Sequence, residues 1–276
     1  MPVAEPVREH DRAADRDDLA LLREVIAEAG ETALGFWRSD PKRWEKEGGS
    51  PVSEADITVD RLLRERLLAA RPDYGWLSEE ADDDALRSMA GRRGFIADPI
   101  DGTRAYLEGK ETWGVAVAVV EDGRPVVGAL FCPALDLLYV ARKGEGATRN
   151  GDPIRVNGDD TAGMRLPRMA GPRGWLNKMP DGYAERVQRV PYIPTLAYRI
   201  ALVADGGIDG TFIRASAHDW DLAASDLILS EAGGALVRAD GERPRYGRDT
   251  TRHGLLVAGS AVQLPQMLDM VRRTED

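Results

Sequence analysis

Residues 95–103 read Phe-Ile-Ala-Asp-Pro-Ile-Asp-Gly-Thr, and this segment constrains the fold more than any other part of the chain. A short apolar run ends in two carboxylates, Asp98 and Asp101, with Pro99 stiffening the turn between them. A buried strand has no use for two anions at its end, whereas Mg²⁺ is held by one or two carboxylates, water and substrate phosphate. The segment therefore predicts a divalent-metal site, although Asp, Pro and Gly are also ordinary turn residues.

The bulk composition excludes several classes of protein. Of the 276 residues, 43% are hydrophobic and 30% are charged, which is typical of a globular protein. The net charge of −10 argues against binding of a nucleic-acid polymer, which favours a basic stripe. Cys132 is the only cysteine, so no intrachain disulfide forms and we expect a cytoplasmic location, with a peripheral position at the inner membrane as the alternative. Because no apolar run approaches about 20 residues, we expect no membrane span.

The hydrophobic spacing predicts a mixed α+β chain with several antiparallel hairpins. We expect residues 1–16 to be a flexible tail and residues 17–276 to be one domain with lobes at about 17–155 and 156–276. Lys42 to Gly49 is expected to be a polar loop. The predicted helices cover 17–37, 53–70, 195–204, 220–232 and 263–271. The predicted strands cover 94–98, 112–120, 125–132, 137–141, 164–170, 211–213 and 257–259.

Four acidic residues occur at positions where a buried helix face or strand would not normally carry a charge: Glu79, Asp98, Asp101 and Asp221. Taken singly, Glu79 could open an acidic loop and Asp221 could serve the first turn of its helix. If the four converge, each pair about 4 Å apart repels by roughly 4 kcal/mol at an effective dielectric near 20. Such a cluster requires bound cations or raised pKa values. Bound cations would also let an acidic protein accept a phosphate ester.

Four motifs together resemble the inositol monophosphatase superfamily of Mg²⁺-dependent, lithium-sensitive phosphomonoesterases. Residues 98–103 resemble its D-P-[IL]-D-G-T motif, and residues 220–224 with 231–234 are similar to its second long motif. Residues 53–56 resemble its T-x-x-D segment, and residues 78–80 its G-E-E segment. The motifs occur in the family's order across about residues 17–271. The resemblance implies an αβαβα layered sandwich, a small-molecule phosphate ester as substrate, and a homodimer.

The resemblance also implies a metal site of two or three Mg²⁺ ions. Glu79, Asp98 and the main-chain carbonyl of Ile100 would hold one ion. Asp98, Asp101 and Asp221 would hold a second, and Glu79 with water molecules would hold a third.

The remaining implied roles concern catalysis and substrate binding. Thr103, hydrogen-bonded to Asp56, would orient and help deprotonate the attacking water, and Glu79 would share in catalysis. From the residues alone, Asp56 is equally well placed to cap the helix that begins at Ser53. The backbone N–H groups of Gly102 and Thr103 would cradle the phosphate. The implied substrate-binding residues are Ile100, Asp101, Gly102, Thr103, Arg199 and Asp221.

The chain departs from the family pattern at two places, and these bear on the substrate. Ser78 replaces a glycine before Glu79, a change that we expect to leave this carboxylate in place. Residues 194–199 read Pro-Thr-Leu-Ala-Tyr-Arg where inositol phosphatases have a G-S-A-A-type turn. Arg199 is similar to a basic residue of 3′(2′),5′-bisphosphate nucleotidases, where it could pair with a second phosphate, or it could extend its stem from the helix into solvent. Tyr198 or His218 could contact an adenine ring.

We therefore expect hydrolysis of adenosine 3′,5′-bisphosphate to AMP, with inositol-1-monophosphatase as the alternative. Histidinol phosphate, fructose 1,6-bisphosphate and a non-catalytic phosphate sensor are weaker alternatives. A Rossmann site at residues 144–149 is rejected, because Arg149 stands where the third glycine belongs.

Overall fold

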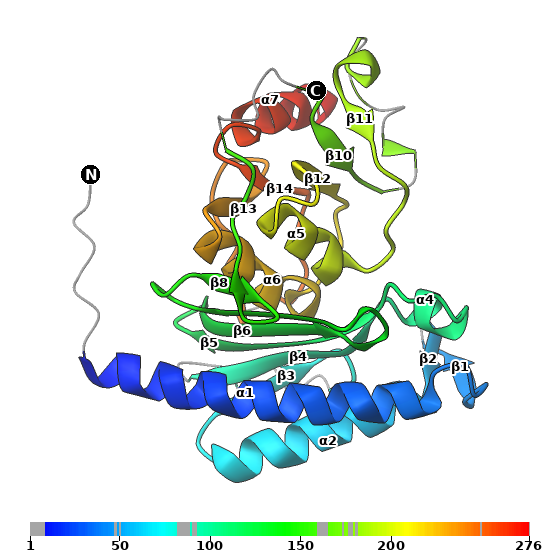
Figure 1. The fold of residues 1–276 in the computed structure, drawn as a ribbon, viewed down its shortest axis with the longest axis vertical. Helices are drawn as coiled ribbons and strands as arrows, with labels where there is room; N and C mark the ends of the chain where they lie inside the picture. Colours follow the sequence, from blue (N-terminus) through cyan, green and yellow to red (C-terminus); the bar gives the residue numbers. More distant parts are fainter. Residues whose placement is uncertain are drawn as a thin grey trace.

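A computed structural model describes residues 9–46, 49, 51–81, 89, 93–158, 165–172, 174–175, 179, 182–248 and 250–275. In this part of the chain, helices and sheets alternate in five layers (Figure 1). The predicted α+β layered sandwich is confirmed.

Two long helices, α1 (Glu9–Phe36) and α2 (Glu54–Ala70), form the first layer below the larger sheet in Figure 1. They pack against each other and against strands of that sheet. The buried apolar residues of α1 repeat at the spacing of one helix face. They are Leu22, Val25, Ile26, Ala29 and Ala33.

Helix α1 begins earlier than predicted. Residues 9–16 form its first turns, so the predicted flexible tail is wrong over this stretch, and residues 1–8 lie outside the described residues. Asp15 and Asp18 are buried on α1, and both carboxylates accept hydrogen bonds from the Arg93 guanidinium, at 2.8 Å for Asp18. A charge-assisted pair of this kind holds a helix segment against the sheet without an apolar stripe.

The larger sheet forms the second layer, and its strands are hydrogen-bonded in chain order. The first two strands are parallel and all the later neighbours are antiparallel. The turn between the third and fourth strands has positive φ at Asp122 and Gly123, as expected for a tight hairpin. The strands are β3 (Gly75–Ser78), β4 (Gly94–Asp101), β5 (Gly114–Glu121), β6 (Arg124–Cys132), β7 (Leu137–Arg142), β8 (Ala147–Arg149) and β9 (Asp152–Pro153).

Helices α5 (Leu196–Ala204) and α6 (Asp219–Glu231) form the third layer, between the two sheets (Figure 1). The smaller sheet has the order β11-β10-β12-β14-β13, and α7 (Leu264–Glu275) packs on its outer side. The predicted helices at 195–204, 220–232 and 263–271 are confirmed with small shifts at their ends. The strands are β10 (Arg168–Ala170), β11 (Gln188–Arg189), β12 (Gly210–Ile213), β13 (Gly234–Arg238) and β14 (Leu256–Ser260).

Several short elements were not predicted. Residues 42–49, expected as a polar loop, include β1 (Arg43–Glu45), which pairs with β2 (Pro51–Ser53). All three residues of β1 are exposed, so no apolar alternation marked the strand. The predicted strand 164–170 is formed only from Arg168, and residue 164 lies outside the described residues. Three short helices complete the description: α4 (Thr103–Leu107) and the 3₁₀ turns Pro133–Leu135 and Ala184–Arg186.

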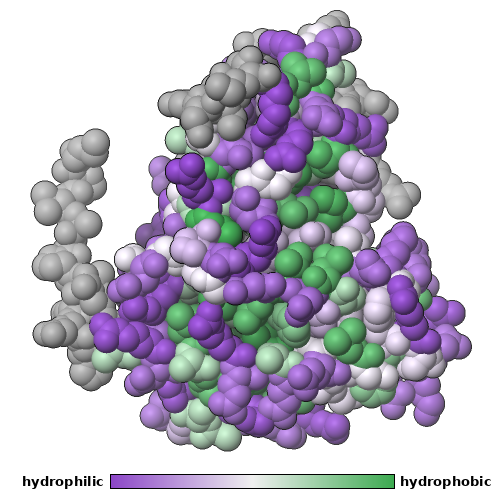
Figure 2. All heavy atoms as spheres, viewed as in Figure 1, coloured by the Kyte–Doolittle hydropathy of each residue, from purple (hydrophilic) through white to green (hydrophobic). Residues whose placement is uncertain are grey.

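The hydrophobic core is divided by the layers. One cluster lies between the first helix layer and the larger sheet, a second surrounds α5 and α6 between the sheets, and a third lies between the smaller sheet and α7. On the face drawn in Figure 2, hydrophilic side chains surround scattered small apolar areas. No helix in the described part of the chain has the length and hydropathy of a membrane span. The predicted division into two lobes stays a prediction.

Candidate active site

The end of β4 places Asp98 and Asp101 on one side of the larger sheet. Asp98 pairs with Ala116 of β5 and Asp101 with Gly114, so three steps along β4 match two along β5. Residues three apart in a regular strand face opposite ways, and an extra residue reverses this. Pro99, which has no N–H to give to the ladder, lies within the irregular stretch.

Asp221 joins these two carboxylates from the first turn of α6. Its Oδ2 accepts a hydrogen bond of 2.6 Å from the backbone N–H of His218, which fixes the side chain at the start of the helix. Carboxylate oxygens of Asp98, Asp101 and Asp221 all lie within 4.8 Å of one another. The structure therefore brings Asp221 together with two of the other predicted anions, Asp98 and Asp101, which are more than 100 residues away from it in the sequence.

Burial and mutual repulsion raise the pKa values of all three carboxyls. Asp98 is 1% exposed, and burial, followed by Glu79, Asp101 and Asp221, raises its pKa well above the usual value. Burial also raises the pKa of Asp101 to about 7, against the effect of two backbone N–H donors, and the pKa of Asp221 to about 8. Buried carboxylates that repel in this way fit a divalent cation, whose charge replaces that of the protons.

Glu79 lies beside the cluster, at the end of β3. The parallel pairing of β3 with β4 carries it there, and its backbone N–H donates to the Ala97 carbonyl at 3.4 Å. Glu79 is near enough to raise the pKa values of Asp98, Asp101 and Asp221. Its own carboxylate forms an ion pair of 3.1 Å with Lys46.

Lys46 was not predicted as part of the site. It also pairs with Glu80, at 2.5 Å, and its pKa is raised by these two carboxylates although burial acts in the opposite direction. The charged sequence around Lys46 gives no sign that this residue belongs to the site, because its contact with Glu79 and Glu80 depends on how the β1–β2 hairpin folds back. The Ser78 hydroxyl donates to Asp60 and accepts from the Glu80 N–H at 3.1 Å, so the serine that replaces glycine ties α2 to the Glu79 segment.

Asp56 and Thr103 form the predicted hydrogen bond. Thr103 Oγ1 lies 3.2 Å from Asp56 Oδ1 and 3.1 Å from the Ile100 carbonyl oxygen. Asp56 Oδ2 accepts hydrogen bonds from the N–H and the hydroxyl of Ser53, at 2.8 and 2.6 Å. The two readings of Asp56, as a helix cap and as the partner of Thr103, therefore hold together through different oxygens. Burial raises the pKa of Asp56.

Gly102 joins β4 to α4 in a conformation that favours glycine. Its φ is 88°, and a Cβ at this position would lie 2.3 Å from the hydroxyl oxygen of Thr195. Thr195 donates this hydroxyl to the Thr112 carbonyl and immediately precedes α5. The first backbone N–H groups of α5, from Leu196 and Ala197, donate to Asp101 at 3.2 and 2.5 Å. The start of α5 therefore holds Asp101, a contact that the sequence did not reveal.

Arg199, Tyr198 and His218 lie in three different surroundings. Arg199 is 5% exposed, donates to the Ile193 carbonyl at 3.0 Å, and lines a cavity of about 200 Å³ with Leu196 and Arg214. The snorkelling alternative for Arg199 is therefore wrong. Tyr198 packs against the core between the sheets, and the His218 ring stacks on Trp220 at 4.6 Å. Neither ring lines the described cavity beside Arg199, so the predicted adenine contacts are not supported.

Comparison with known proteins places the chain in a family. Residues 15–273 match the model of the inositol monophosphatase family. An inositol-1-monophosphatase of Mesorhizobium japonicum is 34% identical, over 82% of this chain and 84% of that protein. A histidinol-phosphatase of Mycobacterium tuberculosis is 34% identical, over 87% and 95%. The 3′(2′),5′-bisphosphate nucleotidase CysQ of Aggregatibacter actinomycetemcomitans is 30% identical, over 77% and 81%.

A solved structure shows the same fold. An IMPase from Thermotoga maritima superimposes with a TM-score of 0.79 and 24% identity, covering 94% of this chain and 98% of that one. The sequence match runs through the segments that supply the three clustered carboxylates, which are the chemical feature expected of a metal-dependent phosphatase. The chain thus belongs to the inositol monophosphatase family and is a phosphoric monoester hydrolase.

Proposed function

We propose that the chain is a Mg²⁺-dependent phosphomonoesterase whose ester carries a second anionic group, as in the 3′(2′),5′-bisphosphate nucleotidase reaction. The observation that carries the substrate class is the cavity lined by Arg199 and Arg214. Leu196 lines this cavity and also donates its N–H to Asp101, so the cavity adjoins the carboxylate cluster. Arg199 is near enough to Asp101 for the two charges to interact.

The metal ligands follow from the cluster. Asp98, Asp101 and Asp221 form one donor set, and Asp98 with Glu79 and the Ile100 carbonyl forms a second. Hard oxygen donors of this kind are the ligands that Mg²⁺ prefers. Bound Mg²⁺ supplies positive charge for the phosphate and lowers the pKa of the attacking water. A third ion, held by Glu79 and water, belongs to the same proposal.

Thr103 and Asp56 handle the proton of the attacking water. Both hydrogen bonds from Ser53 go to Oδ2 of Asp56, which leaves Oδ1 for the Thr103 hydroxyl. When Thr103 donates to Oδ1, its oxygen accepts a hydrogen bond from water and orients it. Because burial raises the pKa of Asp56, Oδ1 is a better proton acceptor than an exposed carboxylate. The N–H groups of Gly102 and Thr103, at the start of α4, face the phosphate in this proposal.

The second anionic group pairs with the guanidinium groups in the cavity. Within the described residues, Nε of Arg199 is buried without a hydrogen-bond partner, and burial lowers the pKa of Arg199. A buried donor in this state is stabilised by an anionic acceptor. Tyr192 is the aromatic residue among those that line the cavity, and its ring would contact a nucleobase in this proposal.

Inositol 1-phosphate is the second candidate, because the Mesorhizobium relative is named for it. The two candidate substrates differ in whether they carry a second anionic group that can bind in the cavity. Inositol 1-phosphate has no second anion for the arginines, so its hydrolysis should not depend on Arg214. The homodimer and the cytoplasmic location stay predictions.

Phosphate release under saturating Mg²⁺ tests the proposal. We expect kcat/KM to be higher for adenosine 3′,5′-bisphosphate than for adenosine 3′-phosphate, which isolates the second phosphate. Inositol 1-phosphate, histidinol phosphate and fructose 1,6-bisphosphate complete the panel, and a higher value for any of them overturns the substrate assignment. Loss of all turnover in excess EDTA is expected, and EDTA-resistant turnover contradicts the metal proposal.

Arg214 is exposed, so its replacement tests the cavity without endangering the fold. Arg214→Ala should lower kcat/KM for the bisphosphate about tenfold, because a hydrogen bond to a charged group contributes roughly 1.5–3 kcal/mol. Hydrolysis of inositol 1-phosphate should not change. Arg61→Ala, which removes an exposed charge from α2, is the matched control.

A further inference from the structure

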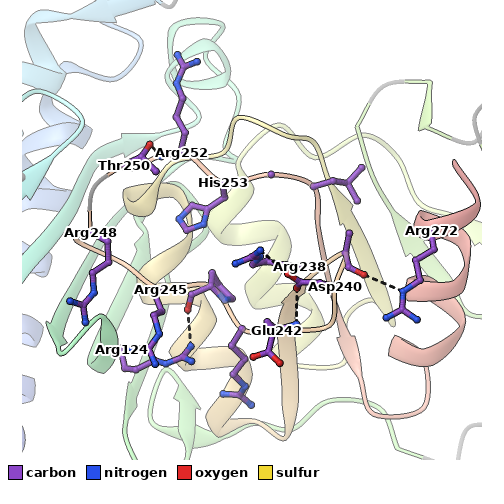
Figure 3. A pocket seen from close by; sticks show the side chains of 15 residues that line it. Arg124, Arg238, Asp240, Glu242, Arg245, Arg248, Thr250, Arg252, His253 and Arg272 are labelled. Atoms are coloured by element: carbon purple, nitrogen blue, oxygen red, sulfur yellow. Dashed lines mark hydrogen bonds and ion pairs between the residues drawn. The ribbon is translucent and has the colours of Figure 1, made fainter. Parts of the chain in front are cut away.

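A second hollow is lined by arginines and shares no residue with the carboxylate site. It has a volume of about 810 Å³ and is formed by the start of β6, the end of β13, the segment up to β14, and α7 (Figure 3). Seven arginines line it, against two carboxylates, Asp240 and Glu242, in a chain whose net charge is −10. The arginines are Arg124, Arg238, Arg243, Arg245, Arg248, Arg252 and Arg272.

The protein neutralises little of this positive charge itself. Arg238 forms an ion pair of 2.7 Å with Asp240. In the described part of the chain, the guanidinium groups of Arg248 and Arg252 form no hydrogen bond or ion pair, and Figure 3 shows Arg248 beside Arg124 and Arg245. Burial lowers the pKa of Arg124, and repulsion from Arg245 and Arg243 lowers it further, although the buried Asp226 acts in the opposite direction. The hollow therefore concentrates like charge that an anion would relieve.

The backbone holds two of these arginines in place. Arg124 donates to the Pro244 carbonyl at 2.7 Å, and Arg245 donates to the Asp122 carbonyl at 3.3 Å. These reciprocal bonds tie the β5–β6 turn to the segment between β13 and β14. Beneath them, Gly247 donates to Asp219 at 2.7 Å, and His253 lies 2.7 Å from the same carboxylate. Arg124 and Arg245 are therefore already ordered by the backbone, which lowers the cost of arranging them around a ligand.

We propose that this hollow binds a small molecule carrying several phosphate groups, such as a nucleoside oligophosphate or an inorganic oligophosphate. Guanidinium groups match phosphate oxygens in a bidentate geometry. One phosphate group would neutralise only part of the charge of seven arginines and two carboxylates. The volume is in the range of small-molecule sites, about 300–1,000 Å³. A local cluster of arginines on an acidic protein suits a compact ligand better than a nucleic-acid strand, which follows an extended basic stripe.

Calorimetric titration with tripolyphosphate in EDTA tests this site. Without a cation, the carboxylate cluster repels anions from its own site and from the adjoining cavity at Arg199, so we expect no contribution from either place. We expect one bound tripolyphosphate per chain, and affinity that falls steeply between 50 and 200 mM NaCl. Inorganic phosphate should bind at least tenfold more weakly. Equal binding of inorganic phosphate, or no binding of tripolyphosphate, overturns the proposal.

Variants of the exposed arginines assign the binding to the hollow. Arg248→Ala and Arg272→Ala should each weaken tripolyphosphate binding by about tenfold, the loss expected for one charge-assisted hydrogen bond. Arg61→Ala is the control for removal of one exposed charge and should leave the affinity unchanged. Equal losses in all three variants mean a general charge effect and contradict a built site. Catalytic activity on the ester substrate, measured with Mg²⁺, verifies that each variant is folded.

Two further ligands identify the class. If metal-free ATP binds more tightly than tripolyphosphate, the ligand is a nucleotide whose base lies against the apolar side chains of Pro244 and Leu255. Equal affinities support an inorganic oligophosphate. A single-stranded oligonucleotide that displaces tripolyphosphate, with an affinity that increases with its length, overturns the small-molecule proposal in favour of a nucleic acid.

Discussion

The carboxylate cluster and the arginine hollow both concentrate charge of one sign, but they differ in burial. Asp98 and Asp101 are 1% and 6% exposed, whereas Arg245 and Arg248 are exposed to solvent. Water and salt screen exposed charges, and a buried cluster can relieve its repulsion only by taking up protons or cations. We therefore expect metal and pH to change stability through the carboxylate cluster, and the exposed arginines of the hollow to contribute little to stability when no anion is bound.

The largest expected effect comes from removing one anion of the buried cluster. Asp98→Asn should reduce kcat by at least about 10³-fold, because the Asp98 carboxylate belongs to both proposed sets of metal ligands. The metal-free variant should unfold at a temperature equal to or higher than that of the parent chain, since one source of repulsion is gone. Steady-state kinetics and a thermal scan in EDTA test both expectations. Activity within tenfold of the parent would refute the metal assignment.

The pH dependence of the unfolding free energy of the metal-free protein tests the buried carboxylate cluster. Aspartate in an unfolded chain has a pKa of about 3.9, whereas burial raises Asp101 to about 7 and Asp221 to about 8. Between these values the folded state binds more protons than the unfolded state, so the free energy of unfolding should fall as the pH rises from 5 to 8. The loss should be on the order of a few kcal/mol.

Mg²⁺ should restore most of this lost stability at pH 8 and little of it at pH 5, where protons already neutralise the cluster. Saturation at about 100 times the dissociation constant stabilises by about 2.7 kcal/mol. Thermal scans at both pH values, with Mg²⁺ and with EDTA, give the comparison. The same Mg²⁺ effect at pH 5 and pH 8 would show that the carboxyls do not titrate as a buried group.

Gly102→Ala disturbs the buried region without changing its charge. The new Cβ requires a left-handed φ and meets the Thr195 hydroxyl, so we expect a loss of roughly 1–2 kcal/mol in unfolding free energy. Activity should fall as well, since Gly102 precedes Thr103. Urea denaturation measures the change, and Gly144→Ala is the matched control. Gly144 also has positive φ, but a Cβ there would meet nothing within 4 Å. Equal losses in both variants would mean that strain alone acts and that the contact with Thr195 does not matter.

The smallest expected effect is that of the exposed hollow on folding. Arg248→Ala should change the unfolding free energy by less than about 0.5 kcal/mol, as for other surface substitutions. Denaturation without added anion measures this value. A loss of more than 1 kcal/mol would place Arg248 in the structural framework and remove the contrast between the two regions.

Much of the fold could be predicted because the signals are local. The helical spacing of α5 and α6 and the apolar runs of β4, β5 and β6 depend on residues that are close in the sequence. Elements without such a pattern were missed. The exposed strand β1 has no apolar alternation, and the first turns of α1 are held by Asp15 and Asp18 against Arg93, a contact across more than 70 residues.

The candidate site divides in the same way. The residue types and spacing of the segment 98–103 predicted carboxylates suited to a metal and a hydroxyl beside them. The sequence could not show that Lys46 pairs with Glu79, or that the amides of α5 hold Asp101. It also suggested Tyr198 for an adenine contact, but this side chain is partly buried against the core between the sheets.

The amino-acid sequence by itself determined which chemical groups and local structures are present: carboxylate oxygens, a stiff turn, a glycine at that turn, and a set of helices and strands. Those properties follow from local stereochemistry and side-chain chemistry. Only tertiary packing decided where the groups meet, bringing Asp221 to Asp98 and collecting seven arginines between residues 124 and 272 around one hollow. The physical reason is that contacts between distant residues depend on how helices and sheets stack, and that information is spread over the whole core.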